Sequence, residues 1–148
     1  MFEFDIRGGR KQQREVVDEV LFWCMKRLMP RVRRITIEVE LTDIEPGHYG
    51  FCYEQDKKHY MMEIDKNLSL YDLIGTVCHE MVHVWQYHSG RLRECGRTGN
   101  WLWRESNWSE SMVLCDGMKH HDLPHEAEAH DMDEKLAQEF FPHMKLRL

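Results

Sequence analysis

The chain has 148 residues, 42% of them hydrophobic, and it carries 20 Lys and Arg against 26 Asp and Glu, a net charge of −6. This length and composition are typical of one soluble globular domain and leave no room for a second. The longest apolar run, Val20 to Met25, is far shorter than the ~20 residues of a membrane-spanning helix. The first residues also lack the apolar segment of a secretory signal. We therefore expect a single domain over residues 1–148 that is not a membrane protein and stays in the cytoplasm.

Five cysteines are too few and too widely spaced for a disulfide framework or a thiolate zinc knot. Their number is odd, and no CxxC pair is present. The sequence therefore predicts reduced, mostly buried thiols at Cys24, Cys52, Cys78, Cys95 and Cys115.

Positive charge is concentrated near the N-terminus, although the chain as a whole is acidic. Overall acidity argues against a dedicated nucleic-acid binder. A local basic cluster at the end of a helix is more often a solvated face than a phosphate site. Nucleic acid is thus a minor candidate partner, through Lys26, Arg27, Arg31, Arg33 and Arg34.

The first half of the chain predicts a helix, a strand and a hairpin. Apolar residues recur with helical spacing over residues 11–29, and Pro30 ends that helix. Residues 35–42 alternate apolar and polar side chains, which indicates a strand with one face in the core. Two further strands, at 49–54 and 59–65, are joined by a short polar segment that suits a hairpin. Together they predict a small three-stranded sheet.

The second half predicts two more helices with a long connection between them. Ser69 begins one helix as its cap, and Gly90 ends it. Another helix follows Pro124 and covers His125 to Phe140. Residues 91–124 show little periodicity, so we expect a long irregular excursion there.

The excursion contains three tryptophans. Long loops in compact domains are often functional, so these side chains are candidates for a lid or a specificity surface over a cleft. Local core packing is the more favoured interpretation. The residues concerned are Trp101, Trp103 and Trp108.

The predicted second helix contains the motif His79-Glu80-Met81-Val82-His83, which has the form HExxH. Residues four apart lie on one face of an α-helix, so both imidazoles can reach a single tetrahedral Zn²⁺. Glu80 lies beside the metal, where its carboxylate can accept a proton from a zinc-activated water and pass it to a leaving amine. This chemistry hydrolyses a peptide bond.

A catalytic zinc site needs a third protein ligand and leaves its fourth position to water. The extended metzincin pattern would need histidine where this chain has Ser89. His88 is also a poor candidate, because it lies about 140° around the helix from His83. The third ligand must come from further along the chain, where residues 120–131 are the densest remaining source.

Within that range, two helix faces offer ligands. Glu126 and His130 share one face, and Glu128 lies on another. Only one of these faces can point at the metal, and spacing alone leaves the choice open.

The segments HEMVHVWQYHSG and PHEAEAHD resemble those of small zincin metallopeptidases, particularly the short SprT-like and gluzincin-type proteins often found in phages and prophages. The resemblance implies Glu126 as the third zinc ligand and His130 as the residue that supports a zinc histidine without binding the metal itself. The usual Asp or Asn is absent at that last position. Glu128, His130 and His125 therefore stay as alternative ligands.

The same resemblance implies an α+β, zincin-like fold and a zinc-dependent peptidase that binds a protein or peptide substrate, in the host cytoplasm if a phage encodes it. In zincins an edge strand beside the cleft pairs with an extended substrate. The strand at residues 59–65 is the candidate, with Tyr60, Met62 and Ile64 expected in the core. An oxyanion-stabilising role cannot be assigned among Tyr87, His88 and Arg104.

Two alternative functions accompany this one. The first is a non-catalytic binding or regulatory module that keeps zinc for stability, for which four protein ligands are typical. The second is a DNA-associated, SprT-like protease that the basic cluster recruits to its substrate.

Overall fold

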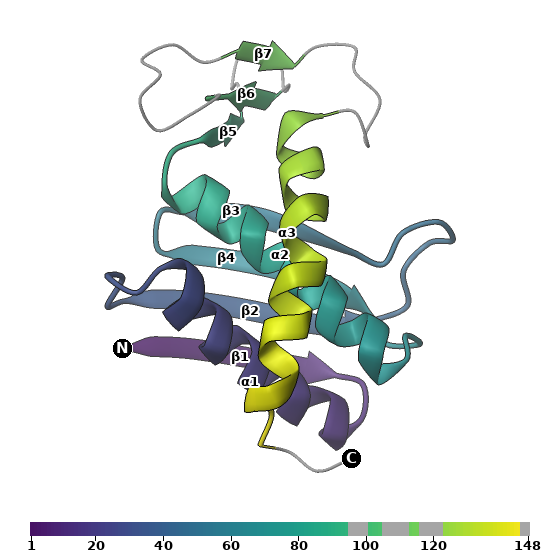
Figure 1. The fold of residues 1–148 in the computed structure, drawn as a ribbon. Helices are drawn as coiled ribbons and strands as arrows, with labels where there is room; N and C mark the ends of the chain where they lie inside the picture. The colour runs from purple at the N-terminus through teal and green to yellow at the C-terminus, as the bar shows by residue number, and fades with distance from the viewer. Residues whose placement is uncertain (95–100, 105–112, 116–122, 146–148) are drawn as a thin grey trace.

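The computed structural model describes residues 1–94, 101–104, 113–115 and 123–145. These residues form an α+β fold with helices α1 to α3, a larger mixed sheet and a smaller antiparallel sheet (Figure 1). Among the described helices, none combines the length and apolar character that crossing a membrane requires.

The larger sheet has the strand order β1-β2-β4-β3. Its first three members in that order run parallel, and β3 is antiparallel to β4. The strands are β1 (Phe2–Gly8), β2 (Ile35–Thr42), β3 (Gly50–Asp56) and β4 (His59–Asp65).

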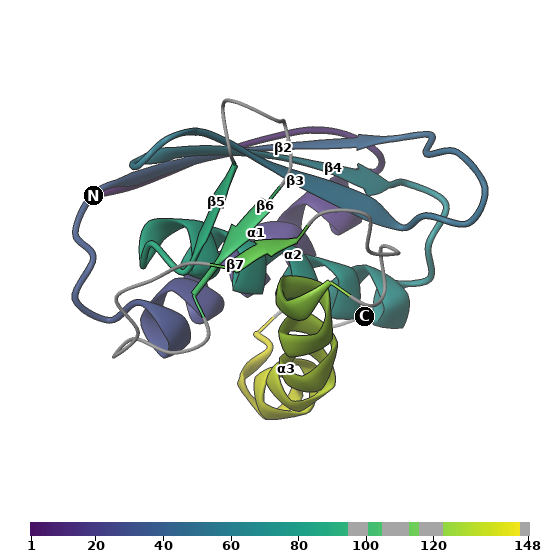
Figure 2. The ribbon, with the colours of Figure 1, turned by 90° about the horizontal axis from the view of Figure 1, so that it is seen from above.

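One face of this sheet forms the core. The apolar members of β2 and β4 alternate with polar residues and point to the same side, where α1 (Lys11–Leu28) and α2 (Leu70–His88) cover them. Figure 2 shows the helices on one side of the sheet. The expected burial of the apolar residues of β4 is confirmed, since three of them are at most 1% exposed: Tyr60, Met62 and Ile64.

The HExxH helix is held by its cap and its packing. The Ser69 hydroxyl accepts a hydrogen bond from the Asp72 backbone N–H at 3.2 Å, as the sequence predicts. α3 (Pro124–Phe140) packs across the side of α2 that faces away from the sheet (Figures 1 and 2). All three helices agree with the predicted ones to within about a residue at most ends.

The predicted three-stranded sheet is wrong by one strand, because β1 adds a fourth. In this segment Phe2, Phe4 and Ile6 alternate with charged residues and pack partly against the core. The same period-two signal that identifies β2 is therefore present at the N-terminus. This strand was therefore predictable from the sequence, since β4, of the same length, is identified by the same alternation.

The strand predicted at residues 59–65 is present as β4, but its predicted position at the edge of the sheet is wrong. β4 lies between β2 and β3, so β3 is the edge strand on that side of the sheet. β4 pairs with β3 along one edge and with β2, in parallel, along the other, so neither edge of β4 is open. Sequence alternation reports which face of a strand is buried but not which strands lie beside it.

The predicted irregular excursion contains a small sheet. Its strands β5 (Leu92–Glu94), β6 (Trp101–Trp103) and β7 (Val113–Cys115) pair antiparallel in chain order. Trp103 is 2% exposed, which favours the core interpretation for this residue. Trp108 and the side chain of Trp101 lie outside the described residues.

Three of the five cysteines have described side chains, and all three are free thiols. Cys24 and Cys78 are buried where α1 meets α2, with their sulfur atoms 3.9 Å apart. Cys52 lies on β3. Cys95 and the side chain of Cys115 lie outside the described residues.

Gly8, at the end of β1, lies too close to β2 for a larger residue. Its φ is +79°, and a Cβ there would run into the backbone of Leu41 on β2. We expect Gly8→Ala to lower the free energy of unfolding by about 3 kcal/mol, since left-handed strain of ~1–2 kcal/mol adds to a steric clash. Gly47 also has positive φ, +92°, but a Cβ added there would meet no atom of the described residues within 4 Å. Gly47→Ala should therefore lose only about 1 kcal/mol, and equal losses in urea unfolding would contradict this account.

Candidate metal centre

The two HExxH histidines lie one turn apart on the face of α2 that meets α3. Their rings are 4.8 Å apart between centroids and almost perpendicular, at 89°. His83 is 5% exposed, and the side chain of His79 is 13% exposed. The helix holds both rings in place because its other faces are packed into the core by Val77, Cys78, Met81, Val82 and Val84.

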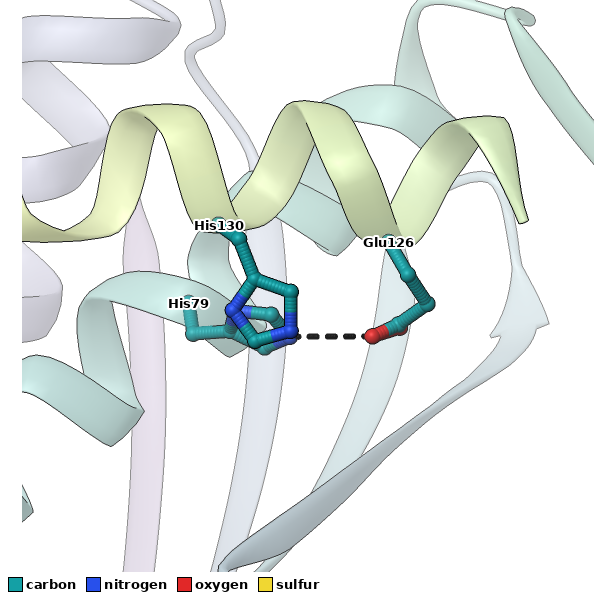
Figure 3. A group of neighbouring side chains, drawn as sticks. All are labelled: His79, Glu126 and His130. Carbon is teal, nitrogen blue, oxygen red and sulfur yellow. Dashed lines mark hydrogen bonds and ion pairs between the residues drawn. The ribbon is translucent and has the colours of Figure 1, made fainter. Parts of the chain in front are cut away.

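Glu126 comes from the first turn of α3 and meets both imidazoles. One carboxylate oxygen lies 2.6 Å from Nε2 of His83, and the other lies 3.3 Å from Nε2 of His79. Figure 3 shows Glu126 and His130 reaching down from α3 toward His79. The three residues that the sequence places first in the ligand set are thus brought together, with Glu126 only 4% exposed.

The other ring nitrogen of His79 bonds to a residue that sequence reasoning missed. Nδ1 of His79 donates to Oδ2 of Asp133 at 2.9 Å. Asp133 lies seven residues after Glu126, so the two acids share one face of α3. The spacing of four residues beyond Glu126 points only to His130, whereas a spacing of seven would have pointed to Asp133.

His130 does not occupy the supporting position that the resemblance implies. Its side chain is 59% exposed, and its Nδ1 is 3.6 Å from Asp133. Its ring lies 4.7 Å from the ring of His79, and its ligand atom falls within the group formed by His79 and Glu126. His130 therefore lies at the rim of the cluster, while Asp133 supports His79.

Gln86, also missed from the sequence, fixes the orientation of His83. This fully buried amide donates from Nε2 to the backbone carbonyl of His125 and to the Glu128 carboxylate, both at 3.0 Å. Its oxygen therefore faces Nδ1 of His83, 2.7 Å away, which must donate. The proton held on Nδ1 leaves Nε2 as the atom that meets Glu126.

Glu128 faces away from the two histidines. Its carboxylate accepts from Nη1 of Arg91 at 2.5 Å as well as from Gln86. The Arg91 guanidinium in turn lies 4.6 Å from the ring centroid of Trp103 and 5.6 Å from that of Trp85. This acid therefore ties α3 to α2 and the small sheet, and its alternative role as a ligand is not supported by its position.

His125 is buried beside His83, with ring centroids 5.6 Å apart, and also packs near Trp103. Of the three residues considered for an oxyanion role, Tyr87 lines the cleft described below. Nδ1 of His88 instead donates to the Lys57 carbonyl at 2.9 Å, and the Arg104 backbone bonds to Arg91. The geometry assigns no oxyanion role among them.

Glu80 lines a cleft of about 1340 Å³ together with the histidines. This residue is 4% exposed, and its Oε2 has no hydrogen-bond partner among the described residues. Burial raises the pKa of Glu80, and the neighbouring His83 and His79 oppose that rise. A carboxylate in the wall of a cleft can act as a base toward a ligand that binds there.

Imidazoles and carboxylates in the cluster shift one another's pKa values. Burial disfavours the charged ring of His79, but hydrogen bonds to Asp133 and Glu126 outweigh it and raise its pKa to about 10. Burial would likewise raise the pKa of Glu126, yet its bonds to His79 and His83 hold that pKa well below the usual range. A metal ion bound to the two Nε2 atoms would take the place of the protons that these carboxylate contacts favour on the imidazoles.

A divalent cation fits this arrangement. Buried carboxylates require a paired cation or a metal, and two imidazole Nε2 atoms with one carboxylate suit a transition metal such as zinc. Metal binding displaces the protons that the imidazoles otherwise carry. His79, His83 and Glu126 are therefore the residues that could hold the ion, with Asp133 and Gln86 orienting the two rings.

Comparison of the sequence with protein-family models, with curated proteins and with solved structures gives no match. The functional argument therefore depends on the residues and their geometry.

The buried Arg91–Glu128 pair has an exposed counterpart in Arg27–Glu139, whose nitrogen–oxygen distance is 2.9 Å. Glu128→Gln should lower the free energy of unfolding by about 2–3 kcal/mol, because it leaves a largely buried guanidinium without its counter-charge. Glu139→Gln should cost less than about 1 kcal/mol, since that pair is half exposed. Thermal and urea unfolding of both variants measure the difference, and a Glu139→Gln loss as large as that of Glu128→Gln would refute it.

Proposed function

We propose that this protein is a zinc-dependent metallopeptidase with a zincin-like active site. The observation that carries the proposal is the convergence of His79, His83 and Glu126 through their ligand atoms, with Glu80 beside them in an open cleft. Structural pairs of surface histidines have no need of two buried acids. A hydrolytic metal site requires both kinds of residue in this arrangement.

His79, His83 and Glu126 would hold the zinc ion and leave a coordination position for water or substrate. When bound, zinc lowers the pKa of water and polarises a carbonyl group. The hydrogen bonds of the two histidines to Asp133 and Gln86 keep both Nε2 atoms aimed at one point.

Glu80 acts as general base and then as general acid. Its carboxylate accepts a proton from the attacking water, whose oxygen forms the new bond to the carbonyl carbon. The same group then donates this proton to the amine nitrogen as the peptide C–N bond breaks. Burial raises the pKa of Glu80, which strengthens its carboxylate as a base.

The edge strand β3 suits an extended peptide better than the strand expected from the sequence. Asp65 donates its backbone N–H to the Tyr49 carbonyl at 2.9 Å, which sets the register of the hairpin. In this register the backbone groups of Gly50, Cys52 and Glu54 point away from β4. A substrate strand can pair with them along the cleft, which β3 lines.

The position of His130 supports one alternative, a non-catalytic module that keeps zinc for stability. This residue offers a ligand atom within 4.8 Å of those of His79 and Glu126. If it completed a set of four protein ligands, the site would be closed to substrate. The exposure of His130 and the open cleft favour the catalytic site.

Zinc content tests the ligand set. Wild type, purified without a metal-affinity tag, should hold about one zinc ion per chain by elemental analysis. His83→Ala and Glu126→Gln should lose it, whereas His130→Ala and Glu128→Gln should retain it. A wild-type protein that stays metal-free after incubation with zinc would overturn the proposal, and loss of zinc in His130→Ala would favour the closed site.

Glu80→Gln separates catalysis from metal binding. This variant should keep its zinc and lose about 10²–10⁴-fold in peptide hydrolysis, because the amide cannot take a proton from water. Hydrolysis is measured as new N-termini in a proteome-derived peptide library, since a single protein substrate can miss a narrow specificity. Glu134→Gln, at the rim of the same cleft, is the matched control and should retain activity. Undiminished cleavage by the Glu80 variant would exclude this mechanism.

A further inference from the structure

A second hollow, of about 470 Å³, lies where the α1–β2 connection meets the β3–β4 turn and the end of α2. It shares no lining residue with the cleft. Five of its six lining residues are Arg, Lys or His, contributed by three separate segments of the chain: Arg31, Val32, Arg33, Arg34, Lys58 and His88. We call it the basic hollow.

The structure divides the basic run of the sequence into two groups. The ammonium group of Lys26 lies over the Phe22 ring at 4.7 Å from its centroid, and Arg27 pairs with Glu139 at 2.9 Å. These two residues belong to the surface of α1. The three arginines after Pro30 line the hollow, so the run does not act as one cluster.

Backbone hydrogen bonds fix the frame of the basic hollow. The Thr36 N–H donates to the Lys58 carbonyl at 2.7 Å, joining the α1–β2 connection to the β3–β4 turn. His88 donates to the Lys57 carbonyl at 2.9 Å, and Lys57 Nζ donates to the Tyr87 carbonyl at 3.0 Å. The three segments that carry the positive side chains are therefore held together.

The arginines and Lys58 of the basic hollow form no ion pair with an acid among the described residues. Within the described ranges, no carboxylate lies within 4.0 Å of the charged nitrogens of its three arginines or of Lys58. The nearby Asp56 carboxylate accepts from the Lys58 backbone N–H. The negative end of the α2 dipole amounts to about half a charge, too little to offset four cations in a protein whose net charge is −6.

We propose that the basic hollow binds a ligand that carries at least two phosphoryl groups. A guanidinium fork bonds to two phosphate oxygens at once, and three arginines contribute to this one site. A terminal phosphoryl group carries about −1.5 to −2 charges at neutral pH, and a phosphodiester carries about −1. Two or more such groups approach the charge of the four cations, whereas a single carboxylate does not. The volume is also in the range of small-molecule sites, roughly 300–1,000 Å³.

Neighbouring phosphoryl groups occur in free polyphosphate compounds and, as phosphodiesters, along a nucleic-acid strand. Two probes distinguish these sources. Inorganic triphosphate is titrated by calorimetry, and a fluorescently labelled single-stranded oligonucleotide is titrated by anisotropy, both at about 50 mM salt. Binding of triphosphate alone would support a free ligand. Tighter binding of the oligonucleotide would support a strand.

The double variant Arg31→Glu/Arg34→Glu should weaken binding of the preferred probe at least about tenfold. The matched control, Lys11→Glu/Lys135→Glu, makes the same charge change at two exposed lysines elsewhere and should weaken it less than about threefold. Circular dichroism confirms that both variants fold. Probe binding through a metal in the cleft would be equal in the two variants, so the test does not depend on the proposed peptidase activity.

Three outcomes would overturn the proposal. The first is that neither probe binds the wild type. The second is that both charge variants weaken binding equally, which would indicate the overall charge of the protein rather than this hollow. The third is that a poly-glutamate peptide binds the hollow as tightly as either phosphate probe.

Discussion

Burial of negative charge between α2 and α3 is the constraint on which this structure depends. Glu80 and Glu126 are each only 4% exposed, and an isolated carboxylate in such a place would be strongly destabilising. The helices therefore cannot meet here through apolar side chains alone. They meet through imidazoles, and each imidazole is in turn held by a second polar residue. The buried carboxylates destabilise this interface when no cation is present, and they are also suitable partners for a bound cation.

The parts of the fold that follow from local periodicity were predictable from the sequence. All three helices and the alternation of β2 and β4 are of this kind, because spacing along the chain alone determines which face is apolar. The order of the strands in the sheet was not predictable from the sequence. β3 follows β2 along the chain, but it is β4, the second strand of the hairpin, that pairs with β2. The three-residue strands β5, β6 and β7 are too short to show a period at all.

The candidate site divides in the same way. The convergence of His79 and His83 follows from four-residue spacing on a helix, and Glu126 follows from the resemblance combined with a helix start. The supporting residues depend instead on the angle at which α3 crosses α2. Asp133 on α3 bonds to His79 on α2, and Gln86 on α2 bonds to the His125 carbonyl on α3. Only the packed helices reveal these contacts. Glu128 lies in the segment expected to supply a metal ligand, but its carboxylate pairs with Arg91 instead.

The separation of the ligand residues along the chain also affects how the protein is made. His79 and Glu126 are 47 positions apart, and a ribosome that adds about 5–20 residues per second needs roughly 2–9 s to synthesise the intervening segment. During this interval α2 exists without the acid that α3 contributes. The nascent chain cannot complete the three-residue cluster until α3 has been synthesised. The three-residue cluster therefore forms only after α1, the larger sheet and α2 have all been synthesised.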